Sequence, residues 1–343
     1  PACADPASLE PPALREELQR CEETDPSRAG RIARVLVRLG EEDPAVRALA
    51  VAPVDQPPQL NRIEDAAWMA QVAAPGLERS LTGLMALLGP EVITWHAHPA
   101  PSYGLSRRER VESLPVPPPL AGEAPEVAVA VGVPAPVLFI TPDRDARLVH
   151  INLAVTGRYH AALAVGKQAL AFEDEPTMRF MLGRKLTFMR AEHLVCTAVD
   201  GPEDLRALHL AVAHILDPGT LPEPPAVVAG LNRVDAYARL RQTFNQAHRA
   251  GAARTALRAA ADSAAEGEDP ALLARWERWL IASAETSFRC GLLVSGDLGA
   301  ALGILDLDSL IPGTDHGHDQ CYPALYEFYL SEDYEALRQI LAG

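Results

Sequence analysis

The chain has 343 residues, 48% of them hydrophobic, and is therefore long enough and apolar enough to bury a large core instead of remaining disordered. Its 46 acidic residues outnumber its 31 basic residues, for a net charge of −15. A surface of that charge repels phosphate, which excludes nucleic acid as a partner. No apolar stretch approaches the ~20 residues that a membrane-spanning helix needs.

The five cysteines are odd in number, lie far apart and form no CxxC motif. This pattern indicates reduced thiols and not a disulfide framework. Together with the lack of a visible signal peptide, it predicts a cytoplasmic protein. The sequence begins at Pro1 and not at Met, which leaves open whether the chain continues upstream.

Residues 1–96 are expected to be helical. The pair Asp25–Pro26 is typical of a helix start, and the apolar residues after it recur at helical spacing. Short alanine-rich helix pairs of this kind resemble the end of a helical-repeat array. Residues 97–135 hold many prolines, as in "LPVPPPLAGEAP", and predict a linker or a long surface excursion.

The pattern changes in residues 136–302, where we expect a small antiparallel sheet of about three strands packed on a long helix. The strands are predicted at "VLFITPD", "ARLVHINLAV" and "YHAALAVG". The helix is predicted from "EDEPT", with Pro176 in its first turn, to Val195. Residues 303–343 are expected to form a loop and a short amphipathic helix. The predicted fold class is α+β, mostly α-helical.

The order of three strands, a long helix and a distant helix with a glutamate resembles the catalytic core of HExxH zinc peptidases of the CAAX-prenyl-protease and heat-shock-protease type (gluzincins). The runs "PVLFITPD", "INLAV", "HAALAVGKQAL" and "DEPTMRFMLGRKLTFMRAEH" follow the order and spacing of that family. The whole arrangement also resembles the C-terminal regions of large bacterial helical-repeat proteins.

The resemblance fails at the zinc motif. Aligning His193 with a later histidine of the family places Gly183 and Thr187 at two zinc-ligand positions and Arg184 at that of the general-base glutamate. Glycine has no donor atom, a threonine hydroxyl is a poor zinc ligand, and arginine is no base at neutral pH. Glu285 stands where the family has its third zinc ligand. These vestigial positions predict neither metallopeptidase activity nor a cofactor.

The same stretch has a plainer interpretation as a core helix. Gly183, Thr187 and Ala191 then form a stripe of small residues that lets a second helix pack closely. If the family arrangement holds, Arg184 and Glu285 share a cavity and form an ion pair in place of zinc. The alternative is that both charges face solvent.

Two weaker metal sites are open. The first is a loop near the C-terminus, where residues at i and i+2 can chelate a metal, although a polar loop is the ordinary interpretation. Its candidate ligands are Asp315, His316, His318 and Cys321. The second set forms a site only if the fold brings its members together. It consists of His160, His193 and Glu285.

Three further residues are expected in the core. Trp276 and Trp279 are spaced i, i+3, which favours core aromatics over a docking face. Cys290 follows Arg289, whose charge favours a thiolate, but a buried helix cysteine is the simpler interpretation.

These observations favour a non-catalytic scaffold built on a degenerate metallopeptidase-like fold, with other proteins as partners. One alternative is a divergent zinc-dependent hydrolase that uses His193, Glu285 and either His160 or the loop 315–321. The other is a small-ligand binder that uses the cavity emptied by the loss of zinc-site side chains.

Overall fold

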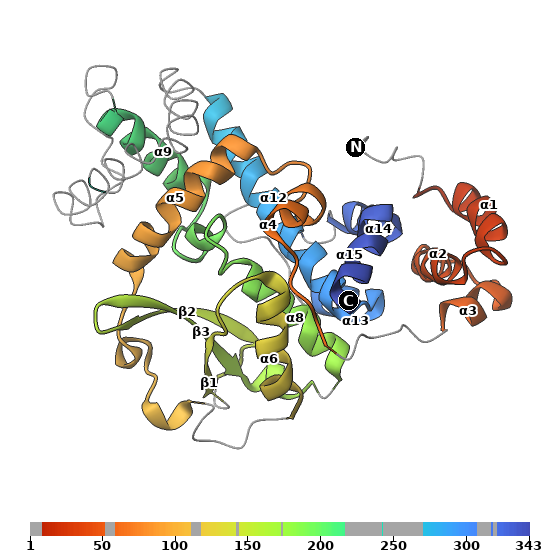
Figure 1. Ribbon diagram of the computed structural model, residues 1–343, viewed down its shortest axis with the longest axis horizontal. Helices are drawn as coiled ribbons and strands as arrows, with labels where there is room; N and C mark the ends of the chain where they lie inside the picture. Colours follow the sequence, from red (N-terminus) through yellow and green to blue (C-terminus); the bar gives the residue numbers. More distant parts are fainter. Residues whose placement is uncertain are drawn as a thin grey trace.

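The computed structural model describes residues 9–51, 59–110, 118–141, 144–172, 174–216, 242, 270–306, 317 and 321–343. These residues form a mostly helical α+β fold with a three-stranded sheet (Figure 1). The α-helices are α1 (Pro11–Cys21), α2 (Pro26–Arg38), α3 (Pro44–Ala50), α4 (Asp65–Ala67), α5 (Arg79–His96), α6 (Pro118–Val131), α7 (Lys167–Leu170), α8 (Glu175–Thr187), α9 (Pro202–Leu216), α12 (Pro270–Ser295), α13 (Leu298–Leu305), α14 (Tyr322–Leu330) and α15 (Glu332–Ala342). Short 3-10 or π segments are η2 (Trp68–Val72), η3 (Ala100–Tyr103), η4 (Arg107–Glu109) and η6 (Leu194–Thr197). The strands are β1 (Val137–Thr141), β2 (Leu148–Val155) and β3 (Arg158–Gly166).

The N-terminal helices begin at the residues that the sequence marks. The Asp25 carboxylate accepts a hydrogen bond from the backbone N–H of Arg28 at 2.9 Å, and Pro26 occupies the first turn, where a missing N–H costs nothing. Helix α2 buries Ile32 and Leu36 and packs against α14. The predicted helix start is therefore confirmed. Within the described residues, no helix is long and apolar enough to cross a membrane.

The sheet has the strand order β1-β3-β2. Strand β3 pairs antiparallel with β2 and parallel with β1. The three predicted strands are confirmed, but the expectation of a wholly antiparallel sheet is wrong. Strands β1 and β2 therefore form the two edges of the sheet. Strand β3 lies between them and runs in the same direction as β1.

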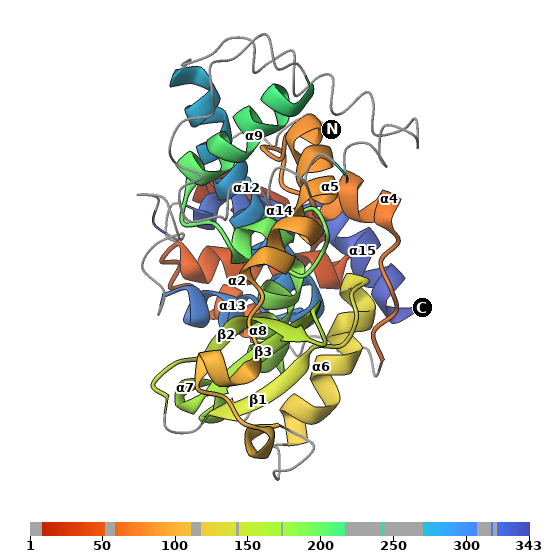
Figure 2. The same cartoon turned by 90° about the vertical axis from the view of Figure 1, so that its left-hand side faces the viewer.

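Both faces of the sheet are buried, because neighbouring side chains of a strand point to opposite faces. On one face, Leu163 and Val165 of β3 belong to the main core that includes α6 and α8. On the other, Ala162 and Ala164 pack in a smaller cluster with Leu105, from the segment between η3 and η4. Figure 2 shows the sheet at one end of the molecule and α9 at the other.

The described part of the proline-rich region 97–135 includes a packed helix, which the expectation of a linker or long surface excursion did not contain. Its residues Pro118–Val131 form α6, whose Leu120 and Val127 are fully buried and which packs on α8. Prolines at the start of a helix lose no hydrogen bond, and only Pro125 lies inside it.

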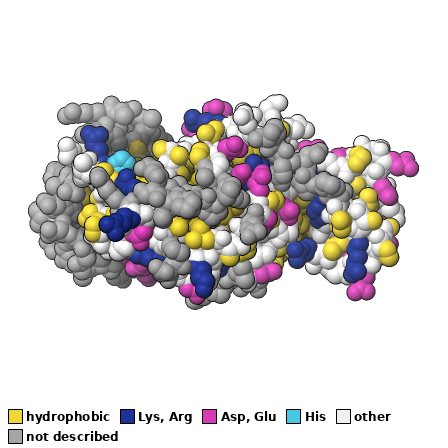
Figure 3. Space-filling model, turned by 90° about the horizontal axis from the view of Figure 1, so that it is seen from below, with side chains coloured by type: hydrophobic (Ala, Val, Ile, Leu, Met, Phe, Trp, Pro, Cys, Tyr) yellow, Lys and Arg dark blue, Asp and Glu magenta, His cyan; other side chains and the backbone are white. Residues whose placement is uncertain are grey.

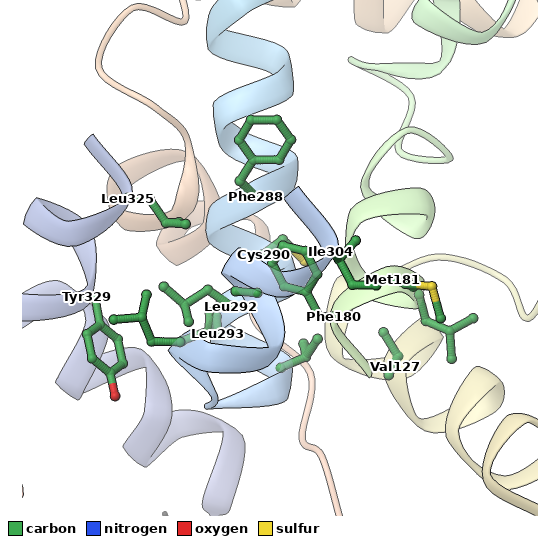
Figure 4. Close-up of a cluster of buried hydrophobic side chains, with 14 of the residues drawn as sticks. Val127, Phe180, Met181, Phe288, Cys290, Leu292, Leu293, Ile304, Leu325 and Tyr329 are labelled. Carbon is green, nitrogen blue, oxygen red and sulfur yellow. The ribbon is translucent and has the colours of Figure 1, made fainter. Parts of the chain in front are cut away.

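Helix α8 lies at the centre of the main core, between α6 and α12. Figure 4 shows Phe180 and Met181 of α8 among side chains from α6, α12, α13 and α14. The helix ends at Thr187 and not at Val195 as expected. Beyond it, Arg190 N–H bonds to the carbonyl of Thr187, a bond between residues i and i+3 that belongs to a turn.

The turn after α8 is held by one buried guanidinium. Arg190 donates to Glu192 at 2.5 Å, to the carbonyl of Val131 at 2.8 Å and to Asp65 at 3.0 Å. Its guanidinium carbon also lies 4.3 Å from the ring centroid of Trp68. These contacts join the turn after α8 to the last residue of α6 and the first residue of α4. If α8 continued as a helix through Arg190, these contacts would not form.

Candidate functional site

The positions aligned with zinc ligands form a helix–helix contact. A Cβ atom added to Gly183 would lie 2.7 Å from Val294 Cγ2 and 2.9 Å from Gly291 Cα, both on α12. Thr187 is fully buried, and its hydroxyl donates to the carbonyl of Gly183 at 2.8 Å. The predicted close approach of a second helix is thus confirmed at Gly183. Ala191 lies outside α8 and is exposed.

His193 is fully buried in the turn that follows α8, and not on the helix itself. Its ring packs edge-on against Phe188, with centroids 6.4 Å apart, and at 30° to the ring of Trp279, 6.1 Å away. Burial lowers the pKa of His193 to about 4, so the ring is neutral at pH 7. Neither ring nitrogen has a hydrogen-bond partner among the described residues.

Arg184 and Glu285 have different surroundings. The guanidinium carbon of Arg184 lies 4.7 Å from the ring centroid of Phe288 and 5.9 Å from that of Phe180. Glu285 lines a separate hollow beside α14, with Arg289. Both residues are half-buried, so the solvent-facing alternative does not describe them. Arg184 lines a cavity beside α13 and Glu285 the hollow beside α14, and the ion pair between them stays a prediction.

The described residues do not form the expected alternative metal sites. They contain no group of three or more His, Cys, Asp or Glu side chains that is able to hold a metal ion. His160 is exposed on β3, whereas His193 is buried, so the proposed set with Glu285 does not converge. Asp315, His316 and His318 lie outside the described residues, and Cys321 is buried at the start of α14. The loop site is therefore untested.

The buried thiols are not activated. Burial raises the pKa of Cys290 to about 12 and outweighs the opposing effects of a hydrogen bond with Thr187 and the charge of Arg190. It also raises the pKa of Cys196 to about 12. The described residues contain no disulfide. Trp276 and Trp279 are fully buried and in contact, with centroids 5.7 Å apart, as expected for core residues.

Two neighbouring cavities open beside the last turn of α8. The main cavity, of about 300 Å³, lies where the β1–β2 loop, α7, α8 and α13 meet. Its polar lining consists of Asp145, Arg147, Gln168, Arg184 and Lys185. The side cavity, of about 130 Å³, lies between α8, η6 and α12 and includes His150 of β2.

Arg184 and Lys185 line both cavities, whereas Gly183 and Thr187 line neither. The space opened by glycine at the zinc-ligand position is therefore filled by α12. The expectation of an emptied active-site cavity is wrong in this respect.

His150, a half-buried residue of β2, lines the side cavity. Its Nε2 lies 2.7 Å from the carbonyl oxygen of Lys185, and because a carbonyl only accepts, Nε2 carries the proton. Burial, with the positive charge of Lys185 as a further cause, lowers the pKa of His150 to about 3. The imidazole therefore stays neutral at pH 7.

Arg147, Lys185 and His150 line the two cavities, and no pattern in the sequence predicts this. No motif joins them, because Arg147 immediately precedes β2, His150 lies in β2, and Lys185 comes from α8. One signal was available: Lys185 is one of the two lysines in the chain, the other being Lys167.

Comparisons of this chain with protein-family models, with curated proteins and with solved structures find no match. The resemblance to HExxH zinc peptidases therefore stays a prediction.

Proposed function

We propose that this chain is a non-catalytic binding protein that takes a small molecule in the main cavity beside α8. The observation that carries the proposal is the convergence of polar side chains from three elements on one space of about 300 Å³. Concave sites lined by a few convergent polar groups are the usual form of small-molecule sites. Arg184 and Lys185, which also reach the side cavity, extend the polar surface available to a ligand.

The chemistry of the lining supports binding and not catalysis. An acid–base catalyst works best with a pKa near the working pH, whereas the pKa of His150 is about 3. A cysteine nucleophile needs its thiolate, whereas burial raises the pKa of Cys196, beside the side cavity, to about 12. Gly183 and Thr187 supply packing where a peptidase has zinc ligands. The prediction of a protein partner stays a prediction.

The proposal is tested by thermal unfolding of the whole chain with a panel of small neutral, cationic and anionic molecules. A ligand present at about 100 times its Kd adds about 2.7 kcal/mol to the free energy of unfolding, which raises Tm measurably. An Ala146→Phe variant places a large ring in the wall of the main cavity and is expected to abolish the shift. The matched control is Val149→Phe, at an exposed position of β2, which is expected to keep it.

Two results would overturn the proposal. The first is a panel in which no molecule raises Tm, or in which Ala146→Phe and Val149→Phe respond alike. The second result would favour the hydrolase alternative. Plasma mass spectrometry of protein purified without a His tag would find stoichiometric zinc, and the protein would have a peptidase activity that chelation removes.

A further inference from the structure

We infer that the side cavity is a second small-molecule site, which takes one neutral aromatic ring that carries an O–H or N–H donor, as in a phenol or an aniline. This site goes beyond the proposed function, because the side cavity is distinct from the main cavity and has a different lining. The polar groups that select the ligand come from three elements: His150 of β2, Thr197 of η6 and Ser287 of α12.

The size and the wall of the side cavity match one aromatic ring. Its volume of about 130 Å³ is close to the roughly 150 Å³ of an apolar cavity that holds a benzene molecule. On the face drawn in Figure 3, hydrophobic and charged side chains are interspersed over the described surface. The side cavity instead gathers apolar side chains, namely Phe188, Val199, Leu280, Ala284 and Phe288. A single ring therefore fills the space and buries its apolar surface against this wall.

Phe188 is held in place before a ligand arrives. Its ring makes edge-on contacts with the rings of His150 and His193, at centroid distances of 5.9 and 6.4 Å. Aromatic rings favour such edge-to-face contacts. A ligand ring that packs against Phe188 meets a side chain that is already ordered, which lowers the entropy lost on binding.

The hydroxyl groups of the lining have their protons committed to oxygen atoms of the protein. Ser287 Oγ donates to the carbonyl of Ala284 at 2.6 Å. Thr197 Oγ1 lies 2.9 Å from the carbonyl oxygen of Leu194 and 3.2 Å from Oδ1 of Asn152, so one of these two oxygens takes its single proton. Both hydroxyl oxygens keep lone pairs, and toward a ligand both are acceptors.

His150 is a third acceptor. Its Nε2 donates to the carbonyl of Lys185 at 2.7 Å, so Nδ1 carries a lone pair and no proton. Burial lowers the pKa of His150 to about 3, which keeps the ring in this neutral form at pH 7. Three side chains of the lining are therefore acceptors, and a ligand satisfies them by donating a hydrogen bond. Arg184 and Lys185 also line the cavity and make other contacts within the fold.

The test is isothermal titration calorimetry of the whole chain with three probes of one ring each: phenol, fluorobenzene and benzoate. Phenol has a donor, fluorobenzene has a ring of the same size without one, and benzoate is an anion. Phenol is expected to bind one molecule per chain and to bind about two- to ten-fold more tightly than fluorobenzene, the range that one neutral hydrogen bond contributes. Benzoate is expected to bind more weakly than phenol, because its carboxylate only accepts.

Ser287→Ala and Thr197→Val each remove a hydroxyl acceptor with little change of shape. At least one of them is expected to remove most of the preference for phenol over fluorobenzene. The matched control is Ser283→Ala, one turn earlier on α12, which removes a fully buried hydroxyl that bonds to the carbonyl of Trp279 at 2.9 Å and is not in the lining. It is expected to leave both affinities nearly unchanged, and circular dichroism verifies that each variant is folded.

Equal affinities for phenol and fluorobenzene overturn the inference, because no hydrogen bond then selects the ligand. Tighter binding of benzoate overturns it as well, because the neighbouring cations then select an anion. The inference is also wrong if none of the three probes binds, or if the preference for phenol survives in both Ser287→Ala and Thr197→Val.

An Ala146→Phe variant separates this site from the main cavity, because Ala146 lines only the main cavity. Phenol binding is expected to persist in this variant. Its loss would place phenol in the main cavity, which overturns the inference and supports the proposed function. If phenol binding persists and no molecule shows a Tm shift that Ala146→Phe abolishes, the proposed function is wrong and the inference stands.

Discussion

Replacement of Gly183 by alanine tests whether this position is a packing contact. The new Cβ would lie 2.7 Å from Val294 Cγ2, 2.9 Å from Gly291 Cα and 3.2 Å from the carbonyl oxygen of Cys290. Two of these three atoms belong to the backbone of α12 and yield only if the whole helix shifts. Overpacking of this kind costs about 1–3 kcal/mol, and the contact distances place Gly183→Ala in the upper part of that range. Alanine returns about 1 kcal/mol through helix propensity, so a net loss of about 1–2 kcal/mol is expected.

The matched control is Gly303→Ala, in α13, where a Cβ would meet nothing within 4 Å. Both substitutions gain the same helix propensity, so the difference between the two free energies of unfolding isolates the packing cost, about 2–3 kcal/mol. Urea unfolding followed by tryptophan fluorescence measures both, since Trp276 and Trp279 are buried on α12. If Gly183→Ala is as stable as Gly303→Ala, the position is not a packing contact and the argument fails.

Three further predictions concern buried polar groups. The pKa values of His150 and His193, about 3 and about 4 in the folded chain, lie below the ordinary 6.5, so the unfolded chain binds protons first as the pH falls. The free energy of unfolding should therefore be constant above about pH 6.5 and should fall by about 1.4 kcal/mol per pH unit per histidine between that pH and pH 4. Urea unfolding at about pH 7.5 and about pH 5 measures the difference. Equal free energies of unfolding at the two pH values would contradict the prediction. Arg190→Leu should lower the free energy of unfolding by about 3–5 kcal/mol, because it leaves buried groups without their partner. The control, Arg206→Leu, removes a partly exposed ion pair and should lower it by less than about 1 kcal/mol. If urea unfolding gives similar losses for the two variants, Arg190 has no special role. Cys290, fully buried and with a pKa of about 12, should resist iodoacetamide at pH 8 until the chain is unfolded, and mass-spectrometric detection of its alkylation in the folded chain would show that the thiol is accessible.

The elements predicted best are those with a signal in their own residues. Asp25 and Pro26 specify the start of α2. The short helix predicted near the C-terminus is α15, at whose start the Ser331 hydroxyl accepts the N–H of Tyr334. The three strands follow from runs of β-branched residues. Such signals act over a few residues, so they are visible without knowledge of the rest of the fold.

The elements predicted poorly depend on contacts between distant residues. Helix α8 ends at Thr187 because Arg190 bonds to Val131, and nothing near Arg190 in the sequence announces that carbonyl. Helix α6 forms in a proline-rich stretch because burial of Val127 on α8 outweighs its poor helix propensity. The parallel pairing of β1 with β3 likewise depends on the path of the chain between strands. The cavity residues belong to the same class, since Arg147 and Lys185 meet only in the folded chain.

Zinc binding and helix packing make opposite demands on α8. A zinc site needs side chains at positions 183 and 187 that project into open space, whereas a close helix crossing needs almost no side chain at 183. The structure meets the second demand, since α12 lies within 2.9 Å of a Cβ at Gly183. Arg184 and Lys185 line the main cavity, and the guanidinium of Arg184 also lies against Phe288 of α12. A ligand in the main cavity would therefore contact Arg184, at the position of the family's general-base glutamate, and neither of the two zinc-ligand positions.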